Sequence, residues 1–149
     1  MVDGGGRLMA EDAGVRRATV DDAGHIAGLH GRMAMVSDAM VGGLVRCYDA
    51  WLRMDNYYAW VASDGMFGFL VYDEPLVGKR QAICGAMYAE SSETAMSLWR
   101  CAIEKARALG VEEIILEARG RTSVKRWERK GFVVERQIMR RALRRGIYG

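Results

Sequence analysis

Hydrophobic residues follow helical and extended periods in turn along most of the chain. Apolar side chains recur every three or four residues over 19–33 and again over 38–54, which predicts two helices. Apolar stretches at 57–72 and 81–88 predict strands, and the Asp64-Gly65 pair tolerates the positive φ angles of a tight hairpin turn. The first half of the chain is therefore expected to form two helices and then a meander of three strands.

The most regular helical pattern spans residues 95–109, and Gly110 follows it, where a left-handed helix end belongs. The other predicted elements are a strand at 15–18, a strand at 111–118, a short helix at 122–130 and strands at 132–135 and 137–143. The sequence thus predicts an α+β fold.

Local signals refine three of these elements. Thr19 offers an N-cap hydroxyl with a carboxylate, Asp22, three residues later. Gly85, inside a strand pattern, is typical of a bulge or of a close backbone approach. The second helix is expected to carry these larger apolar side chains on one side: Met40, Leu44, Cys47, Tyr48, Trp51 and Leu52.

The composition fits one globular domain. Of the 149 residues, 50% are hydrophobic and 28% charged, a balance that excludes a disordered or collagen-like chain. We expect a flexible leader at 1–13, a domain at 14–143 and a loose basic tail at 144–149. No signal-like or membrane-spanning apolar run is present, so the sequence predicts a cytoplasmic protein. The three cysteines lack metal-ligand spacing and are expected to be reduced core thiols.

The net charge is only +3, but basic residues are concentrated late in the chain. Its members are Arg119, Arg121, Lys125, Arg126, Arg129, Lys130, Arg140, Arg141, Arg144 and Arg145. Such a cluster favours an anionic partner, which could be a phosphorylated cofactor, a nucleic acid or an acidic protein surface. A solvated basic face is the equally weighted alternative.

Three stretches in this order carry a family resemblance: Val15 to Asp22, Asp64 to Leu70, and the run Trp127-Glu128-Arg129-Lys130-Gly131-Phe132. Together with the order of elements, they make residues 14–143 resemble the GNAT superfamily of N-acetyltransferases. The resemblance implies a mixed, mostly antiparallel central sheet of six to seven strands, flanked by about four helices. It also implies a splay between the fourth and fifth strands.

The resemblance implies that acetyl-CoA is the cofactor and lies in that splay. Its pantetheine would run along Ala86, Met87 and Tyr88, because strand backbone left unpaired at a splay can bond amides. Its pyrophosphate would face the N-terminal turn of the next helix, where free N–H groups and the helix dipole favour anions. The residues of this turn are Ser91, Ser92, Thr94 and Ala95. Ser123 and Trp127 would complete the cofactor site.

The turn departs from the family's glycine-rich pattern and carries two carboxylates, Glu90 and Glu93. A carboxylate about 4 Å from a phosphate charge costs about 1 kcal/mol in water and about 4 kcal/mol at an effective dielectric of 20. Ser91 followed by Glu93 and Thr94 is also an ordinary helix start without any ligand. Capping alone and phosphate binding both remain open for this turn.

The proton-transfer residues depart from the family as well. Trp127 stands where many members have a tyrosine that protonates the departing thiolate, and an indole N–H cannot ionise usefully. The acid would then be Tyr88, Ser123 or water. Glu117 is the first choice for the base by its position in the splay, although a strand-end ion pair with Arg119 or Arg121 explains it equally well.

Three classes of function follow. The first is an N-acetyltransferase in which the amine of a small-molecule or protein acceptor attacks acetyl-CoA directly. The second is a catalytically degenerate binding or assembly protein, a kind of GNAT relative associated with tailed bacteriophages. The third is a nucleic-acid binder that uses the basic C-terminal face. Aromatic side chains in the last hairpin would suit a homodimer, and no membrane partner is expected.

Overall fold

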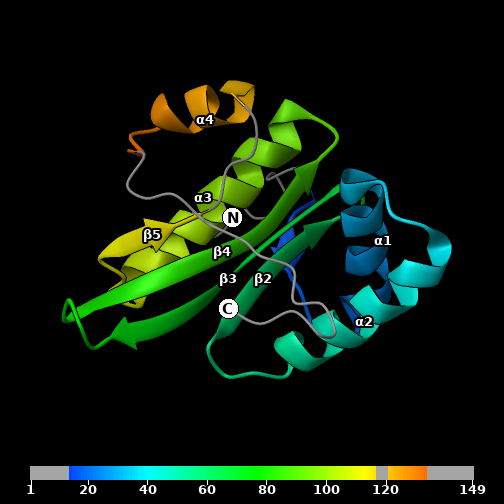
Figure 1. Ribbon diagram of the computed structural model, residues 1–149, viewed down its shortest axis with the longest axis horizontal. Coiled ribbons are helices and arrows are strands. Elements are labelled where there is room, and N and C mark those ends of the chain that lie inside the picture. The colour runs from blue at the N-terminus through cyan, green and yellow to red at the C-terminus, as the bar shows by residue number, and fades with distance from the viewer. Residues whose placement is uncertain (1–13, 117–120, 134–149) are drawn as a thin grey trace, which may run out of the picture. The chain divides into compact units, whose positions relative to one another are not determined.

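A five-stranded sheet forms the centre of the described structure, a computed structural model that describes residues 14–116 and 121–133. Its strands lie in chain order, and only the last pair is parallel. They are β1 (Arg16–Arg17), β2 (Tyr57–Ala62), β3 (Gly65–Glu74), β4 (Lys79–Ala89) and β5 (Glu113–Ile115) (Figure 1). The predicted mixed, mostly antiparallel sheet is therefore confirmed.

Helical segments alternate with these strands along the chain. They are the 3-10 turn η2 (Val20–Asp22), α1 (Ala23–Ala34), α2 (Asp38–Leu52), α3 (Ser92–Ala108) and α4 (Arg121–Glu128). The chain divides into two compact units, residues 1–117 and 118–149, and α4 belongs to the second. None of the described helices is both long and apolar enough to span a membrane.

Two hydrophobic clusters lie on opposite faces of the sheet, because successive strand side chains point to opposite sides. On one face, Leu98 and Ala102 of α3 pack with Trp60, Phe67 and Phe69. On the other face, the helices α1 and α2 cover the sheet. The buried residues of this second cluster include Ile26, Leu29, Tyr48, Val61 and Met66. The sheet is thus sandwiched between α3 and the α1–α2 pair.

Several predicted helix ends are confirmed. Asp22 accepts a hydrogen bond from the Thr19 backbone N–H at 2.8 Å, the reciprocal contact of a capping box. Gly110 has a φ angle of +74° after α3, and Gly131 one of +97° after α4. These glycines adopt the left-handed conformation that terminates helices.

Other predictions are corrected. The hairpin turn consists of Ser63 and Asp64, since Ala62 pairs with Gly65, so Gly65 belongs to β3. The fifth strand begins only at Glu113, because the Val111 N–H donates to the Ala106 carbonyl at 2.9 Å and so completes the end of α3. Within the described residues five strands are present, and Phe132 and Val133 are not in a strand.

The predictions for the two ends of the chain concern residues outside the described structure. The leader at 1–13, residues 134–143 of the two last predicted strands and the tail at 144–149 lie outside the described residues. The single domain at 14–143 stays a prediction.

The predicted apolar side of α2 is in fact two stripes. Val41, Leu44, Val45, Tyr48 and Leu52 pack on the core, and Tyr48 is only 2% exposed. Met40, Cys47 and Trp51 are exposed instead, since they lie a quarter-turn away from that stripe. Cys47 is therefore not a core thiol, whereas Cys84 and Cys101 are buried as predicted.

Met35 ends α1 in the left-handed conformation, with a φ angle of 57° and a side chain that is 90% exposed. A side chain there costs about 1–2 kcal/mol, and glycine adds about 0.5–1 kcal/mol of unfolded-state entropy. Met35→Gly is therefore expected to raise the free energy of unfolding by about 0.5–1 kcal/mol in urea titrations. Met35→Ala, which keeps the Cβ atom, is the control, and an equal gain from alanine would contradict the backbone explanation.

Candidate active site

The strand β4 has an open edge over its second half. The strand β5 pairs with it at Gln81, Ala82 and Ile83, and no further described residue pairs with β4 on that side up to Ala89. This is the predicted splay between the fourth and fifth strands. Among the described residues, no neighbouring strand uses the backbone groups along this edge, so a ligand can bond to them.

A partly buried polar network fastens β5 to β4 where the splay begins. The side-chain amide of Gln81 donates to Glu113 at 2.7 Å, and Tyr72 donates to the Gln81 oxygen at 2.6 Å. The hydrogen bond from Gln81, together with Lys79 at 3.1 Å, holds the pKa of Glu113 below its usual range. This network fixes the two strands together only at their first residues.

A β-bulge interrupts β4 within the open stretch. Phe67 pairs with Met87 and Phe69 with Cys84, so Gly68 faces both Gly85 and Ala86. The bulge predicted from Gly85 is thereby confirmed. A bulge leaves an extra residue out of the ladder and re-aims the backbone, which suits a contact with a bound group.

The helix α3 starts immediately after the open stretch and is held by side-chain caps. The Ser91 hydroxyl accepts a hydrogen bond from the Thr94 N–H at 3.1 Å, and the Thr94 hydroxyl donates to Asp64 at 2.8 Å. Thr94 is only 3% exposed, so its hydroxyl serves the fold. The Ala95 N–H donates to the Ser91 carbonyl at 3.1 Å.

This capping leaves part of the helix start open. Ser92 and Glu93 are exposed, and within the described residues their backbone N–H groups have no acceptor. Those two N–H groups and the Ser92 hydroxyl are therefore the ones that an anion can reach.

The negative charge of Glu90 is neutralised by a residue of α1, Arg32. Its carboxylate forms an ion pair with Arg32 of α1 at 3.0 Å and accepts a hydrogen bond from the Tyr88 hydroxyl at 3.2 Å. Desolvation and this hydrogen bond raise the pKa of Tyr88. The contact with Arg32 draws Glu90 toward α1, which lessens the repulsion expected from the sequence.

Tyr57 packs against the β3 residue that faces the bulge, and the sequence does not reveal this contact. Its ring and hydroxyl lie against Gly68, directly opposite the bulge, so that a Cβ atom on Gly68 would come within 2.8 Å of the ring carbon Cζ. The hydroxyl has no hydrogen-bond partner among the described residues. Burial raises the pKa of Tyr57 to about 12, which keeps the phenol protonated near neutral pH. The register pairs Tyr57 with Leu70 and Gly68 with Ala59, so only the side-chain positions show that this tyrosine meets Gly68.

The remaining predicted residues lie in the hydrophobic core, in α4 or outside the described residues. Met87 is partly buried against the cluster under α3. Glu117 and the side chain of Ser123 are outside the described residues. Trp127 belongs to α4, where its ring meets Phe132 edge-on at 5.4 Å. No group of three metal-ligating side chains occurs within the described ranges.

With its open β4 edge, its bulge and the helix that follows, the chain has the same fold as solved structures of acetyltransferases. No protein-family description and no curated protein sequence matches it. Among solved structures, it is similar to a predicted acetyltransferase with acetyl-CoA from Clostridium acetobutylicum, with 15% identity and a TM-score of 0.70. That match covers 86% of this chain and 94% of the other.

Two further structures have the same fold. A ribosomal-protein-alanine N-acetyltransferase from Brucella melitensis biovar Abortus 2308 matches with 17% identity and a TM-score of 0.61, over 89% of this chain and 98% of the other. An aminoglycoside acetyltransferase from an uncultured soil metagenomic sample, in complex with sisomicin, matches with 13% identity and a TM-score of 0.65. That match covers 87% of this chain and 94% of the other.

Proposed function

We propose that the protein is an N-acetyltransferase that transfers the acetyl group of acetyl-CoA to an amine. The observation that carries this proposal is the open, bulged stretch of β4 that ends directly at the N-terminus of α3. A neighbour with this fold is an acetyl-CoA complex, which supports the same cofactor here.

The cofactor would use the backbone more than side chains. The pantetheine amides pair with the open edge at Ala86, Met87 and Tyr88. The pyrophosphate lies at the N–H groups of Ser92 and Glu93, since two adjacent N–H groups and the helix dipole favour an anion. Ser91 and Thr94 hold the helix start in place, and Ser123 and Trp127 remain proposed cofactor contacts.

The chemistry is a direct attack. The amine nitrogen bonds to the thioester carbon, the carbon–sulfur bond breaks, and CoA leaves as a thiolate that takes up a proton. The developing oxyanion accepts hydrogen bonds from the bulge backbone and from the Tyr57 hydroxyl. Tyr88, which donates a hydrogen bond to Glu90, remains a proposed acid for the departing thiolate. Glu117 remains the proposed base for the amine proton.

Acetyl-CoA is expected to stabilise the folded protein by mass action. At a hundred times the dissociation constant the gain is about 2.7 kcal/mol, or about 5–10 °C in melting temperature for a chain of this length. Thermal unfolding with and without millimolar acetyl-CoA measures this shift, and acetate at the same concentration is the control. An unchanged melting temperature would contradict the assignment of acetyl-CoA as the cofactor.

Ser92→Asp separates phosphate binding from capping at the start of α3. A carboxylate in the first turn stabilises the helix by about 0.3–1 kcal/mol but repels a nearby phosphate by at least about 1 kcal/mol. We expect a slightly more stable protein whose affinity for acetyl-CoA is about tenfold weaker, measured by calorimetry. Ser92→Asn is the uncharged control. An unchanged affinity for Ser92→Asp would place the pyrophosphate elsewhere.

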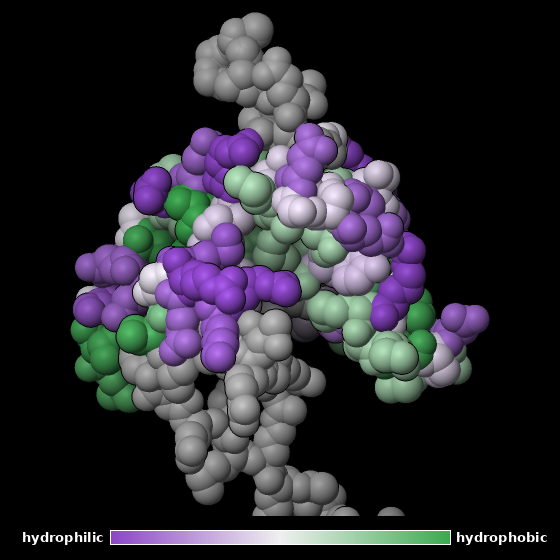
Figure 2. Space-filling model, turned by 90° about the horizontal axis from the view of Figure 1, so that it is seen from above, coloured by the Kyte–Doolittle hydropathy of each residue, from purple (hydrophilic) through white to green (hydrophobic). Residues whose placement is uncertain are grey.

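A binding protein without catalysis is the second candidate. It is favoured by exposed apolar side chains at the α1–α2 end, where Met33, Met35 and Met40 are 39%, 90% and 59% exposed (Figure 2). Large exposed apolar patches are typical of interaction surfaces. Failure of acetyl-CoA to bind, with the fold intact, would favour this candidate.

A further inference from the structure

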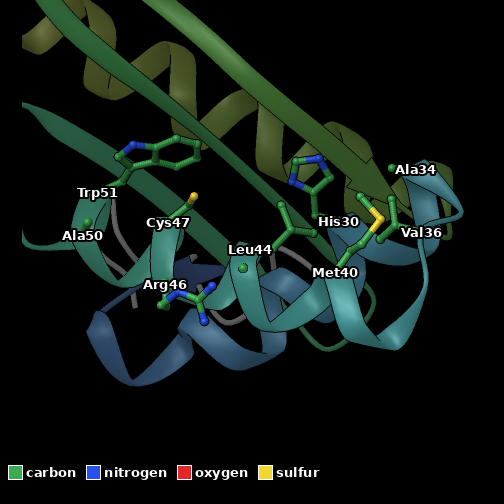
Figure 3. A pocket seen from close by; sticks show the side chains of 10 residues that line it. His30, Ala34, Val36, Met40, Leu44, Arg46, Cys47, Ala50 and Trp51 are labelled. Atoms are coloured by element: carbon green, nitrogen blue, oxygen red, sulfur yellow. The ribbon is translucent and has the colours of Figure 1, made fainter. Parts of the chain in front are cut away.

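A groove of about 610 Å³ lies between α1 and α2 (Figure 3). This volume is within the usual range for small-molecule sites. Its lining is mainly apolar and includes Val36, Met40, Leu44 and Trp51. Two basic side chains, His30 and Arg46, complete it, and Figure 3 shows them on opposite sides of the Leu44 side chain.

An aromatic chain links the groove to the bulge. His30 contacts Tyr48, Tyr48 contacts Trp51, and Trp51 contacts Tyr57, with ring centroids 5.7, 5.1 and 6.0 Å apart. Tyr57 in turn lies against Gly68, opposite the bulge in β4. The Trp51 end of the groove is therefore separated from the bulge by the Tyr57 ring, and the His30 end lies two ring contacts further along this chain.

The polar end beside His30 suits an amine. The ring nitrogen Nδ1 of His30 is 2.7 Å from the Tyr48 hydroxyl, and burial lowers the pKa of His30. The imidazole is then neutral near pH 7, so it does not repel an ammonium group and leaves Nε2 for the ligand.

The charges of the groove exclude polycations. None of its lining residues is acidic, and Arg46 has no carboxylate within ion-pair distance among the described residues. The neighbouring Asp49 is already paired with Arg53 at 3.1 Å. A polyamine or an aminoglycoside would bring several cations to a groove whose one charged lining side chain, Arg46, is itself a cation.

We propose that the groove binds an acceptor with an amine at one end, a carboxylate at the other and an apolar body between them, of which a short apolar peptide is the simplest. Its carboxylate pairs with Arg46, its side chains lie on Leu44 and Trp51, and its N-terminal amine lies beside His30. Acetylation of this bound amine rests on the proposed function. In that step the thioester supplies the acetyl group and CoA leaves.

Calorimetry with the dipeptide Leu-Leu, in the absence of acetyl-CoA, tests the groove on its own. We expect saturable binding that weakens about three- to tenfold when the C-terminus is amidated or when Arg46 is replaced by alanine. In Arg46→Ala the amidated and free dipeptides are expected to bind equally. Arg53→Ala, which removes a paired arginine of the same region, is the matched control.

The outcomes separate this inference from the transferase. Absence of Leu-Leu binding, equal binding of its amide to the unaltered protein, or tighter binding of spermidine overturns the assignment of the groove. Leu-Leu binding with the expected dependence on Arg46 supports it, even if mass spectrometry finds no acetylated dipeptide after incubation with acetyl-CoA. That last result would overturn the proposed transferase alone.

Discussion

Replacing Tyr57 by phenylalanine is expected to lower kcat about a hundredfold, because removal of one preorganised oxyanion donor typically costs about 10²–10³ in rate. The affinity for acetyl-CoA is expected to stay unchanged, since Tyr57 contacts Gly68 of β3 and the pyrophosphate is proposed to lie at the start of α3. The free energy of unfolding is also expected to stay within about 0.5 kcal/mol, because the hydroxyl has no partner to lose among the described residues. Steady-state kinetics and urea unfolding measure these three quantities.

Tyr58→Phe is the matched control for this prediction. Tyr58 is the next residue of β2 and points to the opposite face, where Arg17 and Lys105 lie over its ring at 4.7 and 5.2 Å. Its kcat is expected to match that of the unaltered protein. A Tyr57→Phe variant with a kcat within twofold of the original would remove Tyr57 from the mechanism.

Gly65→Ala is expected to destabilise the protein by about 1–3 kcal/mol, because overpacking a tight contact forces the neighbours apart. A Cβ atom on Gly65 would lie 2.7 Å from Thr94 Cγ2 and 2.9 Å from the Tyr88 carbonyl oxygen. To relieve this overlap, either the end of β4 or the start of α3 must shift. Both of these segments belong to the proposed cofactor site. We therefore expect weaker binding of acetyl-CoA as well, by about tenfold.

Gly42→Ala provides the comparison for this substitution. Gly42 lies inside α2, and nothing lies within 4 Å of an added Cβ atom. Alanine there is expected to raise the free energy of unfolding by about 0.5–1 kcal/mol. If Gly65→Ala is as stable as the original protein in urea titration, the close approach at Gly65 does not position α3.

Local sequence signals predict the parts of the structure that depend on neighbouring residues. The Thr19–Asp22 cap, the glycine end at Gly110 and the bulge at Gly85 are all confirmed. Each follows from backbone conformations that only a few residue types adopt easily. The same locality explains why the order of the described elements, and hence the fold, is predictable.

Local sequence signals do not predict contacts between distant segments. Gly65 reads as a turn residue, yet its small size matters because Thr94 approaches it. Arg32 and Glu90 pair across 58 positions, so the charge of Glu90 looks unfavourable in the sequence and is offset in the structure. In α2, apolar residues cover more than one stripe, and periodicity cannot tell which stripe faces the core and which lines a groove.

The most direct test of the central claim is an NMR titration of the isotope-labelled protein with acetyl-CoA, following backbone amide signals. The largest shifts are expected on residues 85–88 of β4 and on Ser92 and Glu93 of α3. The amides of the β3–β4 turn, at Val77 and Gly78, should not move. An absence of shifts at millimolar acetyl-CoA, or shifts confined to other parts of the chain, would contradict the claim that the open edge of β4 holds the cofactor.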